Sequence, residues 1–165
     1  MGQGYEFKCK CGYSFSPSLG VGFLFPKEYQ ELKESARKGK LGKKLKSFFA
    51  VHPEGGIDAE KVVARCKKCG RYKCVPDLSM YLPTTNEKKP KGIWSTAMPF
   101  EGADYVSPRE LKESYELYAR YPHKCRWCRG ELEIISEEDL VKNGIVCPKC
   151  GRIIPCDEAN IYYWD

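Results

Sequence analysis

Eight of the ten cysteines in this 165-residue chain fall in four closely spaced pairs. The pairs are Cys9-x-Cys11, Cys66-x-x-Cys69, Cys125-x-x-Cys128 and Cys147-x-x-Cys150. Two thiolates on one tight turn converge on a single point, and two such turns complete a tetrahedral zinc site. Four thiolates fill the coordination sphere and leave no position for water or substrate. The sequence therefore predicts two structural zinc ions per chain.

The assignment of the pairs to the two metals follows from their order in the chain. Only 18 residues separate Cys128 from Cys147, so we expect one site to contain Cys125, Cys128, Cys147 and Cys150. The other predicted site spans a 54-residue spacer and contains Cys9, Cys11, Cys66 and Cys69. Such a spacer is tolerable because the free energy of loop closure grows slowly with length.

The two remaining cysteines, Cys74 and Cys156, are expected to be small buried apolar side chains. One alternative is that Cys74 replaces a member of the Cys9-x-Cys11 pair, and another is that His123 acts as a ligand. Iron can occupy four thiolates in the same way as zinc. Thiolate redox chemistry is less favoured, because no thioredoxin-like βαβ pattern surrounds the pairs.

The cysteine turns resemble the zinc-ribbon families with rubredoxin-like knuckles. The resemblance lies in Cys125-x-x-Cys128-x-Gly130 and in Cys147-Pro148-x-Cys150-Gly151, while Cys9-x-Cys11 departs from the pattern. Cys66-x-x-Cys69-Gly70-Arg71 and Cys147-x-x-Cys150-Gly151-Arg152 also resemble each other, as two copies of one module would. As a whole, the chain resembles uncharacterised bacterial double zinc-ribbon proteins. This resemblance implies a fold and a metal but no reaction.

The expected fold class is α+β, with two zinc-ribbon modules made of short antiparallel β-hairpins and with helical insertions. The first module covers 1–83 and carries a helical insertion at about 26–51. An exposed polar loop at 84–92 leads to the second module at 93–165. Ser107, Pro108 and Glu110 predict a capped helix at about 108–120, and Ser136 predicts a second helix that ends near Gly144.

Positive charge is concentrated in the first half of the chain. Residues 1–90 carry 18 Lys and Arg against 9 Asp and Glu, whereas residues 91–165 carry 10 against 13. We expect this half to contact RNA or DNA through phosphate groups, or else to be a solvated basic surface. The candidate residues are Lys33, Arg37, Lys38, Lys40, Lys43, Lys44 and Lys46 on the helical insertion and Lys67, Lys68 and Arg71 on the knuckle, with Tyr72 as a stacking ring.

The leading expectation is a nucleic-acid-binding or adaptor protein, and the alternative is a protein-interaction or homo-oligomeric scaffold module. Its surfaces would be the aromatic segment 161–165 and the apolar segment 23–25. No nucleophile elbow, phosphate-binding loop or His-Glu-x-x-His motif occurs in the sequence, so we do not expect an enzyme. No signal peptide or apolar span of about 20 residues is recognisable, and paired cysteines favour metal in a reducing compartment, so the expected location is the cytoplasm.

Overall fold

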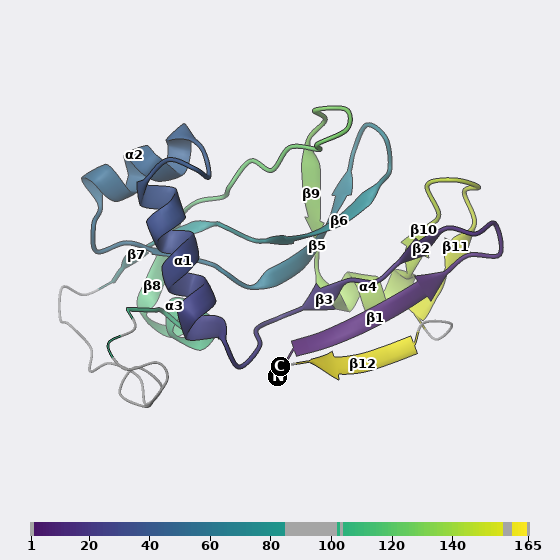
Figure 1. Ribbon diagram of the computed structural model, residues 1–165, viewed down its shortest axis with the longest axis horizontal. Helices are drawn as coiled ribbons and strands as arrows, with labels where there is room; N and C mark the ends of the chain where they lie inside the picture. The colour runs from purple at the N-terminus through teal and green to yellow at the C-terminus, as the bar shows by residue number, and fades with distance from the viewer. Residues whose placement is uncertain (1, 85–101, 103, 157–159, 165) are drawn as a thin grey trace. The chain divides into compact units, whose positions relative to one another are not determined.

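A computed structural model of the chain describes residues 2–84, 102, 104–156 and 160–164 (Figure 1). Within these residues the protein is a mixed α+β structure of short antiparallel sheets and four helices, as the sequence predicts. Apart from Thr84, the predicted exposed loop at 84–92 lies outside the described residues.

Residue contacts divide the chain into two compact units, each assembled from separate segments. The first unit contains 1–22, 60–77 and 122–165, and the second contains 23–59 and 78–121. This grouping differs from the consecutive modules 1–83 and 93–165 that the sequence predicts. The reason is that the two ends of the chain pair with each other, and that the strand before Cys66 pairs with a strand after Cys128.

The first unit contains a sheet in which the N-terminal strand is central. Strand β1 (Gly2–Lys8) lies between β12 (Asn160–Trp164) and the short strands β2 (Ser14–Phe15) and β3 (Ser18–Leu19), as Figure 1 shows. A hairpin follows β1, and Gly12 has a φ of 86° in its turn. Alternating side chains of β1, including Tyr5 and Phe7, are buried in the main core of this unit.

A second sheet of the first unit has the order β6 (Tyr72–Pro76), β5 (Lys61–Cys66), β9 (Leu132–Ile135). Helix α4 (Glu137–Asn143) follows β9, and the Ser136 hydroxyl accepts a hydrogen bond from the Asp139 N–H at its start. The predicted cap and the glycine stop at Gly144 are both confirmed. The small hairpin of β10 (Ile145–Val146) and β11 (Ile153–Ile154) flanks the last cysteine turn.

The second unit contains the predicted helical insertion. Helix α1 (Phe25–Arg37) begins beside Pro26, and α2 (Lys43–Val51) buries Leu45, Phe48 and Phe49. On α1 the buried residues are Phe25, Pro26, Tyr29, Lys33 and Ala36, so a lysine lies on the buried face of this helix. The sheet of this unit has the order β4 (Gly56–Ile57), β7 (Met80–Pro83), β8 (Tyr115–Ala119).

The helix predicted at 108–120 is shorter than expected. Helix α3 (Pro108–Ser114) has the predicted cap, because the Ser107 hydroxyl accepts a hydrogen bond from the Glu110 N–H. After Ser114 the chain becomes β8 and pairs antiparallel with β7. Tyrosines and alternating residue types favour a strand when a neighbouring strand offers hydrogen bonds, and this pairing overrides the helical spacing of Tyr115 and Tyr118.

In the part of the chain that the structure describes, every helix is too short or too polar to cross a membrane.

Candidate metal centres and basic surfaces

Eight cysteines gather in two clusters of four, both within the first unit. In each cluster the four sulfur atoms lie within 4.8 Å of one another. Close approaches include 3.5 Å between the Sγ atoms of Cys9 and Cys150 and 3.4 Å between those of Cys66 and Cys128. A zinc ion with Zn–S bonds of about 2.3 Å separates its tetrahedral sulfurs by about 3.8 Å. The clusters fit two zinc ions.

The pairing of the cysteine turns differs from the one the sequence predicts. Cys9 and Cys11 lie with Cys147 and Cys150, and we call this group the terminal cluster. Cys66 and Cys69 lie with Cys125 and Cys128, and we call this group the central cluster. The predicted sets, which joined neighbouring pairs along the chain, are therefore wrong, because strand pairing brings distant turns together.

Three of the four turns share the same two backbone hydrogen bonds at the same spacing. In the turn of Cys66, the Gly70 N–H donates to the Cys66 carbonyl at 2.9 Å, and the Cys66 N–H donates to the Arg71 carbonyl at 2.9 Å. The turns that begin at Cys125 and Cys147 repeat this pattern. Such a turn exposes successive N–H groups to the sulfur atoms, which is the geometry of a metal-binding knuckle.

The Cys9-x-Cys11 turn is a knuckle that is one residue shorter. The Gly12 N–H donates to the Cys9 carbonyl at 2.9 Å, and the Cys9 N–H donates to the Tyr13 carbonyl at 2.8 Å. Both hydrogen bonds therefore form in spite of the missing residue. The departure from the Cys-x-x-Cys pattern does not prevent this pair from joining a four-sulfur cluster.

The residue after the second cysteine has a positive φ in every knuckle. Three knuckles place Gly12, Gly70 and Gly151 there, with φ of 86°, 70° and 77°. The fourth places Arg129 there, with φ of 59°. A side chain is disfavoured in this region, so Arg129 carries backbone strain that a glycine would relieve.

Gly130 lies two residues after the second cysteine of its knuckle, whereas the glycines of the other knuckles lie one residue after it. Gly130 has a different role. A Cβ atom at Gly130 would lie 2.8 Å from the Lys68 Cβ and 3.1 Å from the Cys66 Sγ. Gly130 is therefore needed for the close approach of the two knuckles in the central cluster.

Backbone N–H groups lower the pKa of Cys66 and Cys125 in the central cluster and of Cys147 in the terminal cluster before a metal binds. The N–H groups of Cys69 and Lys68 lower the pKa of Cys66 to about 6. Burial opposes the ionisation of Cys147, but the N–H groups of Cys150 and Lys149 lower its pKa to about 6. These two thiols supply thiolates near neutral pH, and thiolates are the metal ligands.

A second thiol in each cluster resists ionisation. The Gly130 N–H favours the thiolate of Cys128, but burial and the neighbouring thiols raise its pKa to about 11. At Cys150 the Arg152 N–H has the same favourable effect, and the nearby sulfurs again raise the pKa to about 11. In both thiols, burial and hydrogen bonds to the neighbouring sulfurs favour the protonated form, and a divalent metal displaces the proton when it binds.

The other candidate ligands lie outside both clusters. The Cys74 thiol is half-buried and donates to the Ser18 carbonyl at 3.0 Å, and Cys156 is buried in the main core. His123 is buried, with its Nε2 atom 2.7 Å from the Asp77 carbonyl oxygen. Within the described residues, none of these three side chains belongs to a four-ligand cluster.

The knuckles of the central cluster carry a dense group of exposed cations. Residues 65–73 contain five Lys and Arg, residues 124–129 contain three, and neither segment contains an acid. All eight side chains are exposed. We call them the knuckle cations: Arg65, Lys67, Lys68, Arg71, Lys73, Lys124, Arg126 and Arg129.

An aromatic ring that the sequence pattern did not single out lies among the knuckle cations. The Trp127 side chain is 55% exposed, and its ring centroid lies 5.1 Å from the Arg71 guanidinium and 5.9 Å from that of Arg126. The predicted stacking ring, Tyr72, is only 6% exposed, and its hydroxyl accepts a hydrogen bond from the Val146 N–H. The prediction that Tyr72 stacks on a ligand is therefore wrong, because the ring is part of the core.

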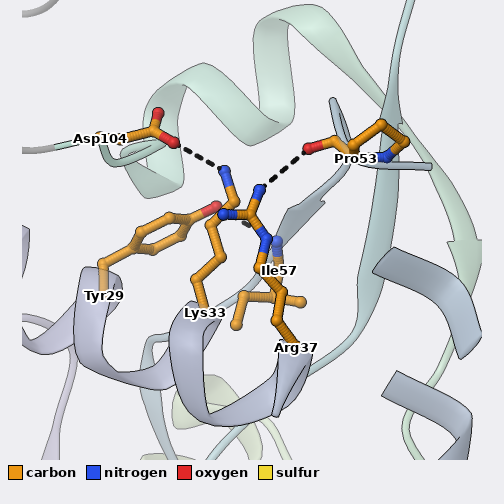
Figure 2. Close-up of polar contacts among 6 residues, drawn as sticks. All are labelled: Tyr29, Lys33, Arg37, Pro53, Ile57 and Asp104. Atoms are coloured by element: carbon orange, nitrogen blue, oxygen red, sulfur yellow. Dashed lines mark hydrogen bonds and ion pairs between the residues drawn. The ribbon is translucent and has the colours of Figure 1, made fainter. Parts of the chain in front are cut away.

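The basic residues of the helical insertion belong to the second unit, and several support its structure. Figure 2 shows Lys33 pointing to Asp104, with its Nζ 3.1 Å from a carboxylate oxygen, and Arg37 donating to the Pro53 carbonyl at 3.2 Å. Lys33 is only 6% exposed and is unsuited to contact a phosphate backbone. Lys38 forms an ion pair with Glu34, and Lys44 donates to the Arg120 carbonyl. The exposed candidates on this segment also include Lys40, Lys43 and Lys46.

The chain is similar to one human protein, the zinc finger and BTB domain-containing protein 21. The two are 32% identical over 91 residues, which make up 52% of this chain and 8% of the human protein. The chain thus spans a small part of that relative's length. No family model and no solved structure matches the chain. The similarity and the two clusters together support zinc-finger-like modules.

Proposed function

We infer that the protein is a non-enzymatic nucleic-acid-binding protein held together by two structural zinc ions. The observation that carries this inference is the group of eight exposed knuckle cations around the central cluster, with no acid in either knuckle segment. Cations on adjacent rigid turns can track a phosphate backbone and release its counterions. The partly similar human protein is named a zinc finger protein, which is in keeping with this role.

Among the described residues, the knuckle cations form few ion pairs with acidic side chains. Lys67 forms an ion pair with Glu131 at 3.0 Å, and both side chains are about half exposed. Lys68 and Arg71 form no ion pair with any described residue. These two cations are the strongest candidates for phosphate contacts. Lys40, Lys43 and Lys46 of the second unit would be an additional contact segment.

The test is binding of the full chain to fluorescently labelled RNA and DNA at several salt concentrations, measured by anisotropy. We expect affinity to fall steeply with salt. The double variant Lys68→Ala with Arg71→Ala should reduce the logarithmic salt slope by roughly 0.7 to 0.9 for each phosphate that it no longer neutralises. The matched control is Lys112→Ala with Lys142→Ala, which removes the same charge from exposed positions outside the proposed contact segments. Binding that does not depend on salt, or no binding to RNA or DNA, would contradict the proposal.

A protein-interaction module is the second candidate, and the exposed edge strand β12 favours it. Its Ile161 and Tyr163 side chains are 53% and 72% exposed on a strand at the end of its sheet. Phe23 and Leu24 are also exposed, whereas Phe25 is buried. Light scattering of the protein and of Ile161→Ser with Tyr163→Ser tests this candidate. A strictly monomeric protein that retains no partner would contradict it.

A further inference from the structure

Trp127 has a large apolar side chain that is exposed to solvent on a knuckle of the central cluster. It lies between the two cysteines of its knuckle, which is closed by hydrogen bonds from the Arg129 N–H to the Cys125 carbonyl at 2.9 Å and from the Cys125 N–H to the Gly130 carbonyl at 2.8 Å. The backbone of this residue is thus fixed by the metal site, while 55% of the side chain stays exposed. A rigid exposed indole gains free energy when a partner covers it and loses little conformational entropy.

The groups around Trp127 are positively charged, and two of them are planar guanidinium groups. The Arg71 and Arg126 guanidinium groups lie 5.1 and 5.9 Å from the ring centroid, and the facing knuckle carries the exposed Lys68. A nucleotide that stacked on the indole would place its phosphate within reach of these side chains. The same guanidinium groups can also stack on the neighbouring bases.

Arg129 supplies an independent indication that charge at this surface is used. It occupies the positive-φ position that the other three knuckles give to glycine. The position places an exposed cation next to Cys128 and two residues from Trp127. Residues other than glycine at positive φ often occur at functional sites, which is in keeping with a role of Arg129 in binding.

We propose that Trp127 is a base-stacking residue and that the ligand of the knuckle cations is single-stranded nucleic acid, RNA or DNA. The proposal rests on the nucleic-acid-binding function inferred above. Unpaired bases present their faces to an aromatic ring, whereas the base faces of a duplex are covered by their neighbours. Cations alone would bind a duplex as well as a single strand. The exposed indole is therefore the feature that favours a single-stranded ligand.

The experiment compares Trp127→Ala and Trp127→Phe with the unsubstituted chain. The probes are labelled oligo-uridine and oligo-thymidine of about 15 nucleotides, a length within the usual site size, and a duplex of equal length. We expect Trp127→Ala to weaken single-strand binding by roughly 5- to 100-fold, the usual range for removal of one stacking ring, and to leave duplex binding unchanged. Trp127→Phe should retain most of the affinity. The salt slope should not change, because no charge is removed.

The controls separate this proposal from the more general one. Zinc content and circular dichroism of both variants must match the unsubstituted chain, which excludes a folding defect. If all three proteins bind with the same salt-dependent affinity, or if Trp127→Ala weakens duplex and single strand equally, the stacking proposal fails and nucleic-acid binding stands. If no protein binds any oligonucleotide, both proposals fail. A loss of self-association in Trp127→Ala without oligonucleotide binding would overturn both and assign the ring to a protein interface instead.

Discussion

The two metal clusters have the same four-sulfur donor set but different surroundings. The terminal cluster lies in the main core of the first unit, where Cys9 and Cys147 are buried among Tyr5, Phe7 and Ile154. The central cluster belongs to a smaller core and is ringed by exposed cations and by Trp127. The zinc site of the terminal cluster therefore mainly stabilises a core, whereas the zinc site of the central cluster also supports a basic surface. The difference comes from the residues between and after the cysteines, since the thiolates are alike.

The largest expected effect is removal of the terminal cluster. Cys147→Ser should release the zinc ion of the terminal cluster and unfold the main core around it, because structural zinc contributes on the order of 10 kcal/mol to the folded state and a domain is stable by only about 5–15 kcal/mol. Cys128→Ser should also release one zinc ion but keep the β1–β12 sheet protected. Metal analysis and hydrogen exchange of the β1 amides measure the two outcomes. Equal loss of protection in both variants would contradict the comparison.

Lowering the pH should release zinc from both clusters over the same range. At neutral pH Cys128 and Cys150, with pKa values of about 11, hold protons that zinc must displace. Affinity should therefore fall at least about 10-fold per pH unit, and at least about 100-fold per unit below pH 6, where Cys66 and Cys147 also take up protons. A chelator competition series from about pH 8 to about pH 5 measures this. Release in two well-separated pH ranges would show that the thiols of the two clusters differ.

Gly144→Ala should destabilise the first unit by about 3 kcal/mol. Gly144 has a φ of 64°, and a Cβ there would clash with the backbone of Ile154 and Pro155, which cannot move aside. The matched control is Gly151→Ala, where φ is 77° but nothing lies within 4 Å, so only about 1 kcal/mol is expected. Chemical denaturation of the zinc-loaded proteins measures both. Equal destabilisation would mean that the backbone around Ile154 yields to the added methyl group at little cost.

The smallest effect concerns Arg129 in the central cluster. Arg129→Gly should stabilise the protein by up to about 1 kcal/mol, because it removes the strain of a side chain at φ of 59°. It should also weaken oligonucleotide binding by removing one cation. Arg129→Ala removes the same charge but keeps the strain, so it should weaken binding without stabilising. Denaturation and anisotropy measurements on the two variants test this, and higher stability with unchanged affinity would show that the arginine has no binding role.

Local features of this protein follow from the sequence alone. The cysteine spacing predicts four metal-binding turns, since a turn depends on residues within a few positions of one another, and all four turns form. The helix caps at Ser107 and Ser136 follow from residues equally close in the chain. The clusters of Lys and Arg are also visible in the sequence, although not which of them are exposed: Lys33 is buried beside Asp104.

Only the tertiary structure decides which turns share a metal. The predicted pairing closes spacers of 54 and 18 residues, whereas the observed pairing closes 135 and 55. Because loop entropy varies with the logarithm of length, the two schemes differ by less than about 2 kcal/mol. The pairing of β1 with β12 and of β5 with β9, and the cores buried beside them, outweigh that difference. The same pairing places Trp127 beside Arg71, so the proposed binding surface exists only in the folded chain.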